Sequence, residues 1–131
     1  LAIPDRPGNN RIDSPLNLIV NPQIGLLFMI PGVKETLRVN GSAEISIDPE
    51  LLELLAVDGK LPRCAIVVTV DEAYIHCAKS IMRSDLWNVD RQIDRKMLPS
   101  MGRILADHIA EDLDVEEYDA SMEERYQKSL Y

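Results

Sequence analysis

The sequence predicts a mainly β, α+β fold in which long antiparallel strands are joined by short helices and followed by a helical, acidic C-terminus. Residues 36–47 alternate polar and apolar side chains, the period of a half-buried antiparallel strand. Residues 64–77 are rich in β-branched side chains, which also favours a strand. From Ser100 onward the apolar spacing becomes helical. This order favours a barrel or sandwich with appended helices over alternating βαβ units.

The composition limits the classes of protein to consider. The chain has 131 residues, 46% of them apolar, which suits one domain with an ordinary core. Its net charge of −8 and its single Trp and single Phe disfavour a nucleic-acid binder. No apolar run approaches the roughly 20 residues that span a bilayer, so we expect no membrane partner. Cys64 and Cys77 are too few for a disulfide framework, so we expect core cysteines in a cytoplasmic protein.

The first 30 residues are expected to form a strand end, a turn, a helix and a strand. Residues 1–4 are typical of a strand end, and because Leu1 is not an initiator Met we expect further sequence upstream. Turn-forming residues fill positions 5–10. Ser14 and Pro15 suit the N-cap and first position of a helix that ends at Val20. Residues 23–30 are continuously apolar, which predicts a strand buried on both faces.

The two long strands are expected to carry irregularities at defined residues. Gly41 predicts a bend or bulge in the first strand, and the pair Asp71 and Glu72 predicts a bulge in the second. Asp48 and Pro49 suit the start of a helix between the strands. Helices are expected at residues 49–55, 78–86, 101–109 and 115–131.

The negative charge is concentrated at the C-terminus. Residues 1–106 contain 13 acidic and 12 basic side chains, whereas residues 107–131 contain nine acidic and two basic ones. Such a block is typical of a solvated helix face or an interaction tail. The body of the protein is therefore nearly neutral.

Residues 8–15, Gly-Asn-Asn-Arg-Ile-Asp-Ser-Pro, join a turn to a helix N-terminus. Backbone N–H groups at such an end are unpaired and favour an anion, and Arg11 suits a phosphate there. The alternative is that Arg11 pairs with Asp13 or faces water.

The polar side of the 36–47 strand carries Thr36, Arg38 and Asn40. Such side chains ordinarily face solvent, unless their face lines a ligand groove. The sequence therefore favours a solvent-facing side for these residues.

Residues 76–87 place Lys79 and Arg83 one helical turn apart, with Trp87 just beyond. Two adjacent like charges favour an anion between them, although Asp85 is an alternative partner. No metal site is expected, because the cysteines and histidines lack the spacing of zinc ligands.

Three segments taken together resemble a known family. They are residues 4–14 (Pro-Asp-Arg-Pro-Gly-Asn-Asn-Arg-Ile-Asp-Ser), residues 21–41 with Leu-Leu-Phe at 26–28 and Glu-Thr-Leu-Arg-Val-Asn-Gly at 35–41, and residues 76–87 with His-Cys-Ala-Lys-Ser and Arg-Ser-Asp-Leu-Trp. In this order they resemble the pyridoxamine 5′-phosphate oxidase-like, FMN-binding split-barrel family, in its branch of uncharacterised bacterial proteins. The likeness runs from about Leu1 to the C-terminus.

The resemblance implies a six-stranded antiparallel split β-barrel with short flanking helices, forming a homodimer with one FMN in each of two clefts between the subunits. The residues that it assigns to cofactor binding are Arg6, Asn10, Arg11, Thr36, His76, Lys79, Arg83 and Trp87. The first three are expected at the FMN phosphate, and Thr36 and His76 at the flavin ring. The last three are expected to come from the partner subunit.

The chain departs from the family in two places. The family's Arg-x-x-x-Leu-Lys strand is absent, so we expect residues 1–131 to be one split-barrel domain without its N-terminal strands. Neither His76 nor His108 follows the family's Arg-x-His pattern, which binds substrate. We therefore expect an FMN-dependent oxidoreductase acting on a small molecule other than vitamin B6. The alternatives are a non-enzymatic flavin- or haem-binding module and a deazaflavin-dependent reductase.

Overall fold

The computed structural model describes residues 1–6, 8, 11–109 and 112–130. These form two compact units, Leu1–Val89 and Asp90–Leu130. The first contains β1 (Ala2–Pro4), α1 (Asp13–Val20), β2 (Gln23–Phe28), β3 (Thr36–Ser46), α2 (Pro49–Leu54), β4 (Ala65–His76) and α3 (Lys79–Ser84). The second contains η2 (Arg95–Met97), α4 (Met101–Ala106) and α5 (Val115–Ser129), and η1 (Val89–Arg91) lies at the boundary. None of the described helices is long and apolar enough to cross a membrane.

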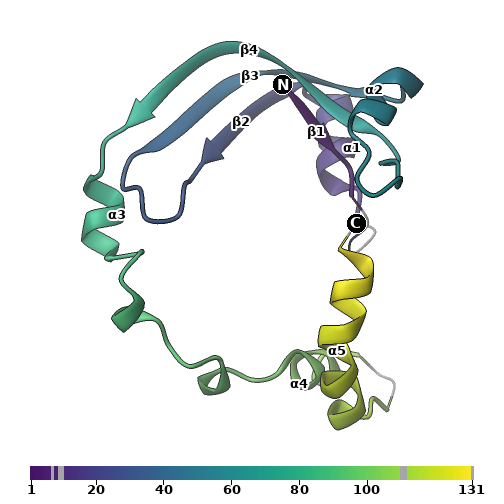
Figure 1. The fold of residues 1–131 in the computed structure, drawn as a ribbon, viewed down its shortest axis with the longest axis vertical. Coiled ribbons are helices and arrows are strands. Elements are labelled where there is room, and N and C mark those ends of the chain that lie inside the picture. Colours follow the sequence, from purple (N-terminus) through teal and green to yellow (C-terminus); the bar gives the residue numbers. More distant parts are fainter. Residues whose placement is uncertain (7, 9–10, 110–111, 131) are drawn as a thin grey trace. The chain divides into compact units, whose positions relative to one another are not determined.

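The first unit is built on a curled antiparallel sheet with the strand order β1-β4-β3-β2. Figure 1 shows that the sheet bends like half of a barrel, with α3 following β4 at the end remote from β1. β3 and β4 pair along their whole length, from Thr36 opposite His76 to Ser46 opposite Ala65. The prediction of an α+β fold with two long antiparallel strands is confirmed. Four strands lie in the described part of the chain, and the six-stranded split barrel stays a prediction.

A bulge interrupts the pairing of β3 with β4. Asn40 pairs with Glu72 and Gly41 pairs with Val70, so Asp71 is the additional residue of β4. A Cβ atom on Gly41 would lie 2.0 Å from the carbonyl oxygen of Thr69, so only glycine fits this backbone approach. The irregularities predicted at Gly41 and at Asp71 are therefore confirmed, and they belong to one feature.

One face of the sheet is entirely apolar, because directly opposite residues of antiparallel strands point to the same side. Its side chains are those of Ile3, Ile24, Leu26, Phe28, Leu37, Val39, Ala43, Ile45, Ile66, Val68, Val70, Ala73 and Ile75. Val39, Ala43 and Val68 are buried in the middle of this face. Toward β1, Leu18 of α1 lines a cavity of about 470 Å³ together with Ile3 and Ile66. α1 therefore covers part of the apolar face.

The other end of the apolar face is uncovered. Phe28, Leu37 and Ile75 lie opposite one another on three neighbouring strands. Their exposed fractions are 43%, 40% and 73%. A row of exposed apolar side chains across a sheet is typical of a surface that another element or chain covers.

Three local predictions in this unit are wrong. β2 is an edge strand without a buried residue, since its apolar run lies at the sheet margin, and it ends at Phe28 rather than Ile30. α1 begins at Asp13 and its N-cap is Ile12, so Ser14 lies inside the helix and does not cap it. Cys77 follows the end of β4 and is exposed, not in the core.

The predictions for Cys64 and for the Asp48 cap agree better with the structure. Cys64 is half-buried, and burial raises the pKa of its thiol, with a smaller contribution from nearby Asp5. Asp48 caps α2 as expected, because its Oδ1 atom accepts hydrogen bonds from the backbone N–H groups of Glu50 and Leu51.

The second unit is a pair of helices in close contact, and both helices were predicted. Ser100 caps α4 by accepting from the N–H of Arg103, and Asp114 caps α5 by accepting from the N–H of Glu117. A Cβ atom on Gly102 would lie 3.0 Å from the carbonyl oxygen of Val115, so the helices cross tightly here. The Gly102 N–H donates a 2.8 Å hydrogen bond to Oδ1 of Asp119.

Asp119 makes the helix pair sensitive to acid. Its pKa is lowered, first by the hydrogen bond from the Ser100 side chain and then by that from the Gly102 N–H. Because the folded pKa lies below the unfolded value, this contribution is present at neutral pH and is lost as the pH falls through the folded pKa. We expect the helix signal in circular dichroism to fall between neutral pH and about pH 2 in the wild type. In Asp119→Asn, this acid-induced loss of signal should be smaller. Superimposable pH profiles of the two proteins would contradict this role.

Candidate functional site

The predicted cofactor-binding residues gather at the two ends of β4. Arg6 belongs to the end near Ala65, where β1 pairs with β4, and Arg11 lies just before α1. The other end holds Thr36, His76, Lys79, Arg83 and Trp87. Asn10 lies outside the described residues.

Arg6 is half-buried immediately after β1. Its Nη2 atom donates to the carbonyl oxygen of Leu55, the residue that ends α2. A cation at a helix C-terminus is electrostatically favourable, which accounts for this position. A guanidinium has five N–H donors, so this bond occupies only part of its capacity for an anion.

Arg11 lies on the surface just before α1. Its Nε atom is 3.1 Å from Oδ2 of Asp13, and both side chains are largely exposed. The structure thus contains the ion pair that the sequence offered as one alternative. An exposed pair of this kind contributes at most about 1 kcal/mol, so an anion of higher charge can compete for Arg11.

At the other end of β4, the strand register brings together two segments that are 40 positions apart. Thr36 begins β3 and lies directly opposite His76, the last residue of β4. Thr36 is only 8% exposed, whereas His76 is exposed. The ring of His76 lies 5.2 Å from the ring of Tyr74, two residues earlier on the same face. The residues expected at a flavin ring are therefore neighbours.

Lys79 and Arg83 are exposed on α3, one turn apart. Neither side chain makes an ion pair or hydrogen bond with another described residue. Asp85, the alternative partner, instead accepts a 2.8 Å hydrogen bond from Nδ2 of Asn88. The two cations are thus available to an external anion.

Trp87 attaches the segment after α3 to the turn before β3. Its Nε1 atom donates a 2.7 Å hydrogen bond to the carbonyl oxygen of Val33. A cavity of about 400 Å³ is lined here by Lys34, Ile81, Met82, Asp85, Leu86, Trp87 and Asn88. This hollow has an aromatic wall, one cation (Lys34) and one carboxylate (Asp85), and neither Lys79 nor Arg83 lines it.

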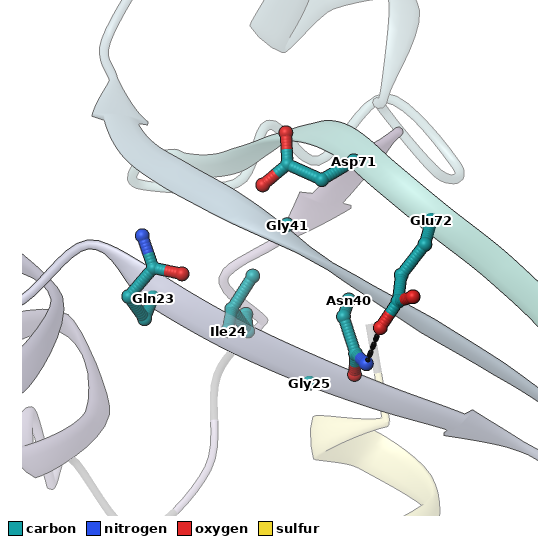
Figure 2. Close-up of a pocket in the computed structure, with 7 residues that line it drawn as sticks. All are labelled: Gln23, Ile24, Gly25, Asn40, Gly41, Asp71 and Glu72. Carbon is teal, nitrogen blue, oxygen red and sulfur yellow. Dashed lines mark hydrogen bonds between the residues drawn. The ribbon is translucent and has the colours of Figure 1, made fainter.

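A second depression lies over the bulge, and Figure 2 shows the seven residues that line it. Nδ2 of Asn40 donates a 2.6 Å hydrogen bond to Oε1 of Glu72, while the Asp71 carboxylate points away from this pair. The lining contains these two carboxylates and no cation. A phosphate does not suit this depression, which separates it from the predicted cofactor site.

Arg38 and Tyr74 were not among the residues predicted to bind a ligand. They lie opposite each other, one pair inward from Thr36 and His76 on the same face. The alternation of residues 36–47 placed Arg38 on the polar side of its strand. Its pairing with Tyr74 depends on the register between two strands, which no local pattern contains.

No family model, curated protein or solved structure matches the chain. The likeness of its three segments to the FMN-binding split-barrel family therefore stays a prediction.

Proposed function

We propose that the chain is a subunit of an FMN-dependent oxidoreductase that acts on a small molecule other than vitamin B6. In this proposal it forms a homodimer, with one FMN in each of two clefts between the chains. The observation that supports the dimer is that cationic residues lie toward both ends of β4. The resemblance of the three sequence segments supplies the identity of the cofactor.

Within one chain, the length of β4 separates Arg6 from the cations of α3. β4 has 12 residues, and a strand rises about 3.3 Å per residue, so its ends lie roughly 35 Å apart along the strand. Arg6 lies toward one end, and Lys79 and Arg83 follow the other. In the proposed two-fold symmetric dimer, the Arg6 end of one chain lies beside the α3 end of its partner.

The uncovered part of the apolar face supports a partner chain. Phe28, Leu37 and Ile75 form an exposed row at the same end of the sheet as Thr36 and His76. Covering such a row removes apolar surface from water, which favours association. The proposed dimer buries this row, which lies on the face of the sheet opposite to that of Thr36 and His76.

Unpaired backbone groups support further strands in the barrel. β1 pairs with β4 only from Ala65 to Val67, and Leu1 adds hydrogen bonds with Val68. Among the described residues, no strand pairs with the outer edge of residues 69–76 of β4. An open edge of this length favours addition of a strand. We infer that the curled sheet is part of a six-stranded split barrel.

The side chains suit the parts of FMN that the resemblance assigns to them. Arg6 near one end of β4, Arg11 before α1, and Lys79 and Arg83 after the other end of β4 carry N–H donors suited to a phosphate. Thr36 and His76 present polar atoms and a ring to the flavin. FMN, when bound, supplies hydride-transfer chemistry, and the protein binds and orients it.

The test is the binding of FMN to the purified protein and to Arg11→Ala. A charge-assisted hydrogen bond contributes roughly 1.5–3 kcal/mol, so the Kd for FMN is expected to rise about tenfold or more. Stability should change little, because Arg11 is exposed and its ion pair with Asp13 is exposed too. Quenching of FMN fluorescence measures the Kd. An unchanged Kd would show that Arg11 does not contribute to FMN binding.

The absorption spectrum of the protein as purified separates the alternatives. The proposal predicts a flavin spectrum that bleaches with a suitable nicotinamide or chemical reductant. A Soret band would indicate haem, and a deazaflavin spectrum would indicate the related reductases. A protein that takes up no FMN would contradict the proposed function.

A further inference from the structure

Arg38 is a half-buried cation that has no partner among the residues the structure describes. It lies in the middle of the sheet, between Leu27 of β2 and Tyr74 of β4. No described residue accepts a hydrogen bond from its guanidinium or forms an ion pair with it. Its half-buried position on the sheet lets the stem pack against neighbouring side chains while the guanidinium keeps donors for a ligand.

The carboxylate that is closest by register does not satisfy Arg38. Glu72 lies on the same face, one residue pair further along, diagonal to Arg38. Its Oε1 atom accepts a hydrogen bond from Asn40, the residue directly opposite. The hydroxyl of Tyr74, directly opposite, is a possible acceptor, but no hydrogen bond joins it to Arg38 among the described residues. The guanidinium thus keeps its donors available on this face.

The surroundings of Arg38 contain aromatic rings and the residues expected at the flavin. Tyr74 lies directly opposite Arg38, and the His76 ring is 5.2 Å from the Tyr74 ring at an interplanar angle of 37°. Thr36 is two residues away from Arg38 on the same strand and points to the same side. One guanidinium and two rings therefore share this part of the sheet.

We propose that Arg38 binds the carboxylate of an aromatic acid whose ring lies against Tyr74 and His76. A single guanidinium matches the single charge of a carboxylate and can bind it in a bidentate manner. A phosphate group is better matched by the two cations Lys79 and Arg83 on α3. That this acid is the substrate rests on the proposed function, and Arg38 then determines specificity by selecting acids over neutral analogues.

The test uses benzoate as the probe, with benzamide as its neutral analogue of the same shape. Calorimetry with the purified protein, with and without added FMN, should detect benzoate and show benzamide at least tenfold weaker. Arg38→Gln should weaken benzoate at least tenfold and leave benzamide unchanged. Arg103→Gln is the matched control, because it removes one charge from α4 and should leave both affinities as they are.

A second variant separates a binding role from a structural one. Arg38→Met keeps the length of the side chain and removes the unpaired charge, so its melting temperature should equal or exceed that of the wild type. A clear loss of stability in Arg38→Met would assign Arg38 a structural role and overturn the proposal. Equal benzoate affinity in the wild type and Arg38→Gln, or no benzoate binding at millimolar concentration, would also overturn it. Because benzoate is titrated without FMN as well, failure of FMN binding alone would contradict the proposed function and leave this site standing.

Discussion

Replacing Gly41 with valine is expected to unfold most of the sheet. A Cβ atom at this position would lie 2.0 Å from the Thr69 carbonyl oxygen and 3.0 Å from its carbon, both backbone atoms of the adjacent strand. Relieving this overlap requires β3 and β4 to separate at the bulge, where Asp71 is already unpaired. We expect a loss of about 3 kcal/mol or more in the free energy of unfolding, measured by urea titration.

Gly8→Ala is the control for this substitution. A Cβ atom on Gly8 would meet only the Arg6 carbonyl oxygen, at 4.0 Å, so the change should cost less than about 1 kcal/mol. Gly25 provides an intermediate case, because a Cβ there would lie 3.3 Å from Oδ1 of Asn40. Equal stability of the Gly41 and Gly8 variants would show that the strands do not approach as closely as the bulge requires.

Removing both cations of α3 should have the largest effect on cofactor binding. Lys79→Gln combined with Arg83→Gln eliminates two charges that have no partner among the described residues. With roughly 1.5–3 kcal/mol for each charge-assisted hydrogen bond, the Kd for FMN should rise by at least about a hundredfold. Folding should be unaffected or slightly favoured, since two like charges one turn apart repel.

The control for this variant removes the same charge from the other unit. Arg103→Gln combined with Lys128→Gln changes two helical cations that are paired with Asp107 and Glu124. Both ion pairs are exposed, so little stability is lost. The control should bind FMN like the wild type. If it weakens FMN as much as the α3 variant does, the effect reflects net charge and not a site.

The long strands could be predicted because their patterns are local. Alternation over residues 36–47 and the β-branched run after Cys64 identify β3 and β4, and glycine at position 41 marks the bulge. Asp48 predicts the start of α2 because its side chain accepts hydrogen bonds from N–H groups no more than three residues away. These features do not depend on distant parts of the chain.

The wrong predictions concern residues whose burial depends on where their segment lies in the folded sheet. The apolar run of β2 suggested a fully buried strand, but the number of neighbours of a strand is set by the sheet order and not by its own sequence. Cys77 has an apolar neighbourhood in sequence and is exposed because β4 ends at His76. Position within the sheet is the missing information in both cases.

Only part of the candidate site could be predicted from local sequence patterns. Lys79 and Arg83 share a helix face by spacing alone, so their proximity could be predicted. The contact of Thr36 with His76 and of Arg38 with Tyr74 depends on the register of two strands. That register became visible only in the folded chain.

Mixing two variants that each fail to bind FMN tests most directly whether one FMN is held by two chains. One variant carries Arg6→Gln and Arg11→Glu, and the other carries Lys79→Gln and Arg83→Gln. After co-refolding in equal amounts, half of the dimers contain one chain of each kind and one intact site, so FMN binding should recover to about one quarter of the wild-type capacity. A mixture that binds no more FMN than the separate variants would contradict a cofactor site shared between two chains.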